Sequence, residues 1–225
     1  MTEFDLVIFD CDGVLIDSEI ISARMLVAEL LRLGLSIDLP YVERNFLGRS
    51  YPVVMETIRR EFGLDLPPGF EAQYREALLA AFQQELTIVP HVREVLETIG
   101  VPFCVATSSS PRRVEMSLKL VGLSDLVVDR VFTSTLVARG KPAPDLFLHA
   151  AGRMGAAPER TLVIEDSLTG IRAGLAAGMT VWRFVGGSHL GPGTPKEPDD
   201  ALPHRRLVSF ADFFQIAPSL GRQVA

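Results

Sequence analysis

Two aspartates, Asp10 and Asp12, stand two positions apart at the end of a short apolar run and directly before Gly13. The run, Leu6 to Phe9, is typical of a buried strand because it is continuous and bounded by polar residues. Residues i and i+2 of an extended chain point to the same side, so both carboxylates can act on one substrate. Paired charge at the end of a buried strand is costly unless a cation or a reaction uses it. The spacing therefore predicts a catalytic pair.

Three other segments carry polar groups where predicted strands end or helices begin. The hydroxyl cluster Thr107 to Ser110 follows a second apolar run. The acidic pair Glu165 and Asp166 follows a third run, and Lys141 precedes a helical pattern. Because parallel strands end at one edge of a sheet, we expect four carboxylates, several hydroxyls and one ammonium group to meet there.

Four carboxylates at one edge require a cation, because two of them about 4 Å apart repel by about 4 kcal/mol at an effective dielectric constant of about 20. Oxygen ligation by carboxylates and carbonyls suits Mg²⁺, and the sequence holds no His or Cys cluster for zinc. Mg²⁺, Lys141, hydroxyls and helix N-terminal amides together form a receptacle for a phosphate group. A carboxylate nucleophile beside a second carboxylate suits covalent transfer assisted by acid and base.

The elements that position these groups alternate between strands and helices, which predicts an α/β fold with a parallel sheet covered on both faces. The expected strands are 6–9, 103–106, 130–132, 161–164 and 180–184, and the expected helices are 91–99, 112–121, 145–154, 168–177 and 209–216. Residues 18–85 do not continue the alternation of strands and helices, because they show helical patterns only. We therefore expect a catalytic core of residues 1–17 and 86–225, with residues 18–85 inserted as a helical cap over the ligand site.

Composition excludes several classes of function. The net charge of the 225 residues is −6 and no basic block is present, so we expect no nucleic-acid partner. No apolar run approaches the roughly 20 residues that span a bilayer, and the N-terminal residues lack a signal-peptide pattern. Cys11 and Cys104 are far apart and are expected to be buried, reduced thiols. We expect a cytoplasmic protein with no membrane partner, and the sequence leaves open whether it is a monomer or a small homo-oligomer.

Four motifs carry a family resemblance. The ordered set Asp10-Cys-Asp12-Gly, Thr107, Lys141-Pro-Ala-Pro and Glu165-Asp-Ser resembles the signature of the haloacid dehalogenase-like hydrolase superfamily. The residues of the last two motifs are similar to those of the branch that contains β-phosphoglucomutase and small phosphosugar phosphatases. The resemblance implies a Rossmann-like, doubly wound parallel sheet with an α-helical cap domain inserted after the first motif.

The resemblance also implies catalytic roles. Asp10 would attack phosphorus, become an aspartyl phosphate and bind Mg²⁺. Asp12 would protonate the leaving oxygen, later deprotonate the attacking water, and bind Mg²⁺ through its backbone carbonyl. Lys141 would steady Asp10 and the phosphoryl group.

The remaining motif residues would bind phosphate or metal. The resemblance implies that Thr107 and the amide of Ser108 hold phosphate oxygens. Asp166 would ligate Mg²⁺ directly and Glu165 either directly or through water, since adjacent residues on a strand face opposite ways.

Within the superfamily, Asp12 favours phosphoryl transfer, because dehalogenases lack an acid at that position. The lysines are Lys119, Lys141 and Lys196, so the cap has none, and a cap lysine is needed by phosphonate-cleaving relatives. Mutases of the β-phosphoglucomutase type use a cap lysine and a histidine at the position of Ser22. Hydrolysis is therefore favoured, and a phosphosugar mutase or a non-catalytic relative that binds a phosphometabolite remain the alternatives.

The cap segment Leu47-Gly48-Arg49-Ser50 offers a substrate contact, because a glycine turn lets Arg49 reach a hydroxyl or carboxylate over the phosphate site. The sequence of this segment resembles that of phosphatases acting on sugar phosphates and on phosphorylated sugar acids such as 6-phosphogluconate. The sequence thus predicts a Mg²⁺-dependent phosphatase of a small phosphorylated sugar or sugar acid.

Other polar residues are expected to be structural. Ser109 and Ser110 precede a predicted helix and are expected to cap it. The four histidines are scattered along the chain and are expected to be structural or solvated: His91, His149, His189 and His204.

Overall fold

The computed structural model describes residues 3–46, 49, 51–190, 194 and 196–222. Six parallel strands form one sheet in the order β3-β2-β1-β4-β5-β6. The strands are β1 (Leu6–Phe9), β2 (Phe103–Thr107), β3 (Val131–Thr133), β4 (Thr161–Glu165), β5 (Thr180–Phe184) and β6 (Arg205–Leu207).

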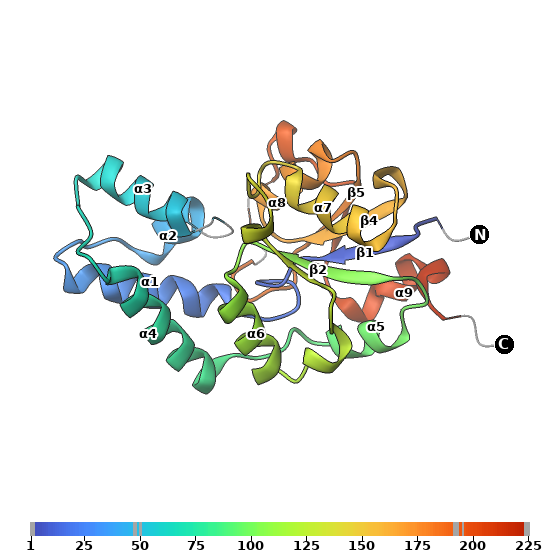
Figure 1. Ribbon diagram of the computed structural model, residues 1–225, viewed down its shortest axis with the longest axis horizontal. Coiled ribbons are helices and arrows are strands. Elements are labelled where there is room, and N and C mark those ends of the chain that lie inside the picture. Colours follow the sequence, from blue (N-terminus) through green and yellow to red (C-terminus); the bar gives the residue numbers. More distant parts are fainter. Residues whose placement is uncertain (1–2, 47–48, 50, 191–193, 195, 223–225) are drawn as a thin grey trace.

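Helices cover both faces of this sheet (Figure 1). One face packs against α5 (Val92–Thr98), α6 (Pro111–Leu120) and α9 (Phe213–Ile216), and the other against α7 (Asp145–Met154) and α8 (Leu168–Ala176). Short 3-10 turns lie at Ser124–Leu126, Ser134–Leu136, Pro158–Arg160, Asp199–Ala201, Phe210–Asp212 and Pro218–Leu220.

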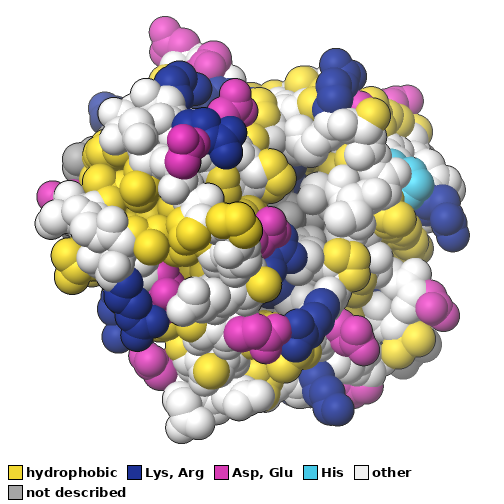
Figure 2. Space-filling view, turned by 60° about the vertical axis from the view of Figure 1, so that its left-hand side comes forward, with side chains coloured by type: hydrophobic (Ala, Val, Ile, Leu, Met, Phe, Trp, Pro, Cys, Tyr) yellow, Lys and Arg dark blue, Asp and Glu magenta, His cyan; other side chains and the backbone are white. Residues whose placement is uncertain are grey.

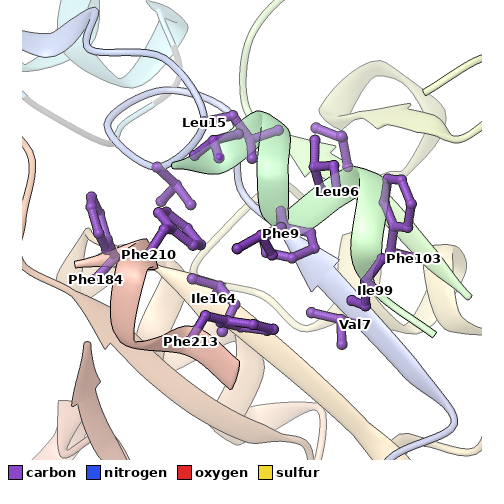
Figure 3. Packing of buried hydrophobic residues seen from close by; sticks show 14 of the residues in the cluster. Val7, Phe9, Leu15, Leu96, Ile99, Phe103, Ile164, Phe184, Phe210 and Phe213 are labelled. Carbon is purple, nitrogen blue, oxygen red and sulfur yellow. The ribbon is translucent and has the colours of Figure 1, made fainter. Parts of the chain in front are cut away.

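The central strand β1 is fully buried because its residues alternate between two apolar clusters. Val7 and Phe9 enter the cluster shared with α5 and α9, whereas Leu6 and Ile8 enter the cluster shared with α7 and α8. The ring of Phe9 lies 6.2 Å from that of Phe213 (Figure 3). Packing on both faces fixes the end of β1, and with it the residue that follows.

The strand order places a topological switch point beside β1. The chain runs from β1 outward to β3 on one side and from β4 outward to β6 on the other. In doubly wound sheets ligands bind in the crevice beyond the carboxyl ends of the strands at such a point. Asp10 lies there, and its amide donates to the carbonyl of Ile164 over 2.9 Å.

Between β1 and β2 the chain forms four helices, α1 (Glu19–Arg32), α2 (Leu39–Asn45), α3 (Tyr51–Phe62) and α4 (Phe70–Glu85), to the left of the sheet in Figure 1. They enclose a separate apolar cluster that includes Leu30, Ile58 and Phe82. The amide of Asp17 donates to the carbonyl of Thr87 over 2.9 Å, so the segment leaves and returns at one place. The predicted α/β class with inserted helices is confirmed.

Three expectations about secondary structure need correction. Strand β6 was not predicted, because its three residues include two exposed arginines and only one buried apolar residue. The strand expected at 130–132 is displaced by one residue, and the helix expected at 209–216 is a 3-10 turn followed by the four residues of α9. Within the part of the chain that is described, no helix has the length and apolar character needed to traverse a bilayer.

Candidate active site

Lys141 joins the ends of three strands. Its ammonium group lies 2.5 Å from Oδ1 of Asp10, which follows β1, and 2.7 Å from Oε1 of Glu165, which ends β4. It also donates to the carbonyl of Ala106 in β2 over 3.0 Å. Burial opposes a charge on Lys141, but the two carboxylates outweigh it and raise the pKa of the ammonium group. The group is therefore a permanent cation at the centre of the site.

Three buried carboxylates gather around this edge of the sheet. Asp10, Glu165 and Asp166 each offer one oxygen, and these oxygens lie within 4.8 Å of one another. Burial raises the pKa of Asp10 and of Asp166 well above the ordinary value, and the neighbouring carboxylates raise both further. Excess negative charge from hard oxygen donors is what a divalent ion such as Mg²⁺ neutralises, so this donor set fits the predicted metal.

Glu165 shares the cluster with Asp166 although the two residues are adjacent. Strand β4 ends at Glu165, so strict alternation does not extend to Asp166. The Glu165 carboxylate turns toward the start of α8, where Oε2 accepts from the amide of Ser167 over 2.8 Å and from its hydroxyl over 2.9 Å. A Cβ at Gly170 would lie 1.7 Å from Oε1 of Glu165, so a larger residue there would displace this carboxylate from its contacts.

Asp12 is held apart from these three carboxylates by three donors. Its Oδ1 accepts from the hydroxyl of Ser18 and from the guanidinium of Arg113, each over 2.6 Å, and Oδ2 accepts from the hydroxyl of Ser109 over 2.6 Å. Burial would raise the pKa of Asp12, but the charge of Arg113 and the hydroxyl bonds outweigh it and lower the pKa. Asp12 is therefore an ionised carboxylate in the protein without substrate.

The predicted phosphate-binding residues lie at the end of β2. Thr107 is the last residue of the strand, and its hydroxyl accepts from the amide of Ser109 over 3.0 Å. The carbonyl of Ser108 accepts from Ser134 over 3.2 Å. Thr107 and Ser108 both line the same pocket as Asp10 and Lys141.

This pocket lies between the sheet and the inserted helices. Figure 2 shows a hollow between the two halves of the molecule, with acidic and basic side chains on its floor. Helices α1, α3 and α4 contribute Glu19, Ser22, Tyr51 and Tyr74 to its wall. Arg49 is among the residues that line this pocket, whereas its neighbours 47, 48 and 50 lie outside the described residues.

Comparison with known proteins identifies the family. A model described as haloacid dehalogenase-like hydrolase matches residues 4–178. The chain belongs to this family of hydrolases.

Two relatives of this hydrolase are named as phosphatases, and a solved structure shares its fold. The 6-phosphogluconate phosphatase of Escherichia coli (strain K12) is 30% identical over 217 residues, which cover 96% of this chain and 94% of that protein. The phosphorylated carbohydrates phosphatase of Thermotoga maritima is 32% identical over 185 residues, or 78% of this chain and 82% of that one. A conserved haloacid dehalogenase-like protein of Agrobacterium tumefaciens has a TM-score of 0.82 at 32% identity, covering 96% and 98% of the two chains. The predicted family, fold class and phosphatase type are confirmed.

Sequence reasoning about this hydrolase missed Ser109 and Arg113. Ser109 was expected to cap α6, but its hydroxyl donates to Asp12, and Ser110, which is the N-cap residue, makes no side-chain capping bond. Arg113 reaches from α6 to Asp12 and to the hydroxyl of Ser22, 3.1 Å away in α1. Its neighbour Arg112 pairs instead with Glu76 of α4. Nothing in the sequence distinguishes these two arginines, because only the packing of α6 decides which one faces the site.

Proposed function

We propose that this hydrolase is a Mg²⁺-dependent phosphatase that removes phosphate from a small phosphorylated sugar or sugar acid through an aspartyl phosphate at Asp10. The observation that carries the proposal is the contact of Lys141 with both Asp10 and Glu165 at the switch point of the sheet. One oxygen of Asp10 is held by an ammonium group, so the other is oriented to attack.

The side chains of Asp10, Glu165 and Asp166, with the backbone carbonyl of Asp12, would hold the metal. When bound, Mg²⁺ supplies positive charge that stabilises the transferring phosphoryl group. Lys141 supplies a second positive charge beside Asp10, and Thr107 with the amide of Ser108 would offer hydrogen bonds to phosphate oxygens. These groups are preorganised, because Thr107 is the last residue of β2 and Lys141 is held by its contacts with Asp10, Glu165 and the carbonyl of Ala106.

In the first half of the reaction, an oxygen of Asp10 forms a bond to phosphorus while the ester bond to the leaving oxygen breaks. The leaving oxygen takes a proton from Asp12. A phosphate dianion arriving beside Asp12 raises the pKa of that carboxyl, so Asp12 takes up a proton from solvent when the substrate binds and can then act as the acid.

In the second half, water attacks phosphorus, the bond from phosphorus to Asp10 breaks, and Asp12 takes the proton of the water. The base role is supported by the donors around Asp12, which lower its pKa in the protein without substrate. Asp12 therefore ends the second half protonated, as it was in the substrate complex, and it releases this proton to solvent when the phosphate product leaves.

We also propose that residues 18–85 are a cap domain and that residues 1–17 and 86–225 are the catalytic core. This division is supported by the separate apolar cluster of α1–α4 and by the single point at which the segment leaves and returns. Cap side chains line the pocket, so closure of the cap would exclude bulk water from the phosphoenzyme.

The function is tested by phosphate release from a panel of phosphorylated sugars, sugar acids and nucleotides, with Mg²⁺ present and with a chelator. We expect release to require Mg²⁺ and to be fastest with a sugar or sugar-acid phosphate. Interconversion of β-glucose 1-phosphate and 6-phosphate without net release would favour the mutase. No release from any compound, p-nitrophenyl phosphate included, would favour a non-catalytic binding protein.

We expect Arg49→Ala to lower kcat/KM for the best sugar or sugar-acid phosphate by about 10- to 100-fold, the worth of a charge-assisted hydrogen bond. The loss with p-nitrophenyl phosphate should be small, since that compound lacks the hydroxyl and carboxylate groups that Arg49 would contact. Arg59→Ala is the matched control, because Arg59 is an exposed arginine of α3 that pairs with Asp65. Equal losses on both substrates would exclude Arg49 as a specificity contact.

A further inference from the structure

His189 contacts one of the proposed metal ligands. Its Nε2 lies 2.7 Å from Oδ2 of Asp166, and the two side chains are only 4% and 5% exposed. His189 belongs to the loop that follows β5, at the same edge of the sheet as the catalytic residues. The sequence left open whether His189 is structural or solvated, and this buried contact favours a structural role.

Two glycines make room for this contact. A Cβ on Gly13, whose φ is +76°, would lie 2.2 Å from Oδ2 of Asp166 and 2.9 Å from the ring of His189. A Cβ on Gly187 would lie 2.7 Å from the same ring and 3.1 Å from the carbonyl of Gly13. Any larger residue at either position would push the imidazole away from Asp166, so the loop after β1 and the loop after β5 fit closely around it.

The loop that carries His189 is itself anchored. The amide and the hydroxyl of Ser188 donate to Oδ1 of Asp17, over 3.2 and 2.8 Å. In β5, just before this loop, Nε of the buried Arg183 donates to the backbone carbonyl of Asp166 over 3.0 Å. A second nitrogen of Arg183 pairs with Glu197 at 2.9 Å. Asp166 is thus held through its main chain by Arg183 and through its side chain by His189.

We propose that His189 is a positioning residue for the metal ligand Asp166, an inference that rests on the proposed metal-dependent function. Nε2–H of His189 donates to Oδ2 of Asp166 and fixes the rotamer of the carboxylate, so that the ion meets an oxygen already in place. Hydrogen bonds to ligating carboxylates orient them, and their loss typically costs about 10- to 100-fold in metal affinity. His189 acts through Asp166 and not on the substrate.

Direct ligation of the ion by His189 would be distinguished from positioning by its effect on the preference for Mn²⁺ or Mg²⁺. An imidazole that ligated the ion directly would favour Mn²⁺ over Mg²⁺, because nitrogen ligands suit transition metals and Mg²⁺ prefers oxygen. A positioning residue instead affects both ions alike, because both would bind the same carboxylate oxygen.

The test measures binding of the metal alone to the substrate-free protein, with Mn²⁺ followed by electron paramagnetic resonance and Mg²⁺ by competition. We expect His189→Ala to weaken both ions by a similar factor of about 10- to 100-fold. His189→Gln should recover most of the affinity, because its amide nitrogen can reach the position of Nε2, whereas the shorter side chain of His189→Asn should not. His149→Ala is the control, since His149 lies in α7 beside Phe132. This variant should bind both ions as tightly as the unmodified protein does.

Unchanged affinity in His189→Ala, or equal affinity in the Gln and Asn variants, would overturn the positioning role. A loss for Mn²⁺ without a loss for Mg²⁺ would overturn it in favour of direct ligation. The Gln and Asn pair decides the question even where the alanine variant does not fold by circular dichroism. If the unmodified protein binds neither ion and Asp166→Asn changes nothing, the proposed metal site fails. If the unmodified protein binds the ions, Asp166→Asn weakens that binding and the His189 variants leave it unchanged, the metal site stands and only the positioning role of His189 fails.

Discussion

Asp10→Asn is expected to lower kcat/KM for p-nitrophenyl phosphate and for the best sugar phosphate by at least about 10³-fold, because an amide cannot form the acyl phosphate. Acid-quenched enzyme should carry the mass of a phosphoryl group in the unmodified protein and none in the variant. The fold should survive, since burial raises the pKa of Asp10 and the charged carboxylate is costly to bury. Lys141 keeps Glu165 as a partner in this variant.

The matched control for this prediction is Asp5→Asn. Asp5 precedes the same strand at its opposite end, where it pairs with Arg160 on the surface. We expect unchanged kinetics from this control and native circular dichroism from both variants. Substantial turnover by a folded Asp10→Asn protein would exclude the covalent mechanism and leave the site as one that activates water directly.

The sequence predicted the part of the site that depends on local pattern and on topology. Asp10, Lys141 and Glu165 were expected to meet because each follows or precedes a recognisable element, and parallel strands end at one edge. Their contacts in the structure agree with that expectation. Their catalytic roles stay predictions until the variants are measured.

Arg113 and His189 were not recognised, because their positions depend on tertiary packing. Arg113 stands beside Arg112 at the start of a helix, and either could have faced the site. His189 lies in a loop rich in glycine and proline, where no periodic pattern indicates direction. A signal was nevertheless present, since β5 ends at the same edge as β1 and β4, and the rule applied to Asp10 also applies to the loop after β5.

Lys141→Met is expected to lower kcat/KM by about 10³-fold and also to destabilise the metal-free protein. Methionine nearly preserves the volume of the side chain next to Phe147 but removes the cation that balances Asp10 and Glu165. Removing one partner of a buried ion pair costs about 3–5 kcal/mol, because the remaining charges stay buried without compensation. Lys119→Met, on α6, is the control.

The destabilisation should depend on pH in a defined direction. The folded-state pKa values of Asp10 and Asp166 lie above the unfolded value of 3.8, so the native state binds more protons than the unfolded chain. The free energy of unfolding therefore falls as pH rises from about 4 through the raised values. Loss of the Lys141 charge raises the pKa of Asp10 further, so in Lys141→Met the fall should be deeper and extend to higher pH. Saturating Mg²⁺ should reverse most of it, because the ion replaces the missing positive charge.

Thermal or urea unfolding at several pH values between about 5 and 8, with Mg²⁺ and with a chelator, measures this linkage. If the stability of the variant in chelator fell with pH no more than that of the unmodified protein, the carboxylates would not be electrostatically coupled to Lys141. If the stability of the variant depended on pH but did not increase with Mg²⁺, the ion would not bind next to the carboxylates that Lys141 balances. Only the combination of both responses fits one cluster, in which an ammonium group and a divalent ion share the charge of Asp10.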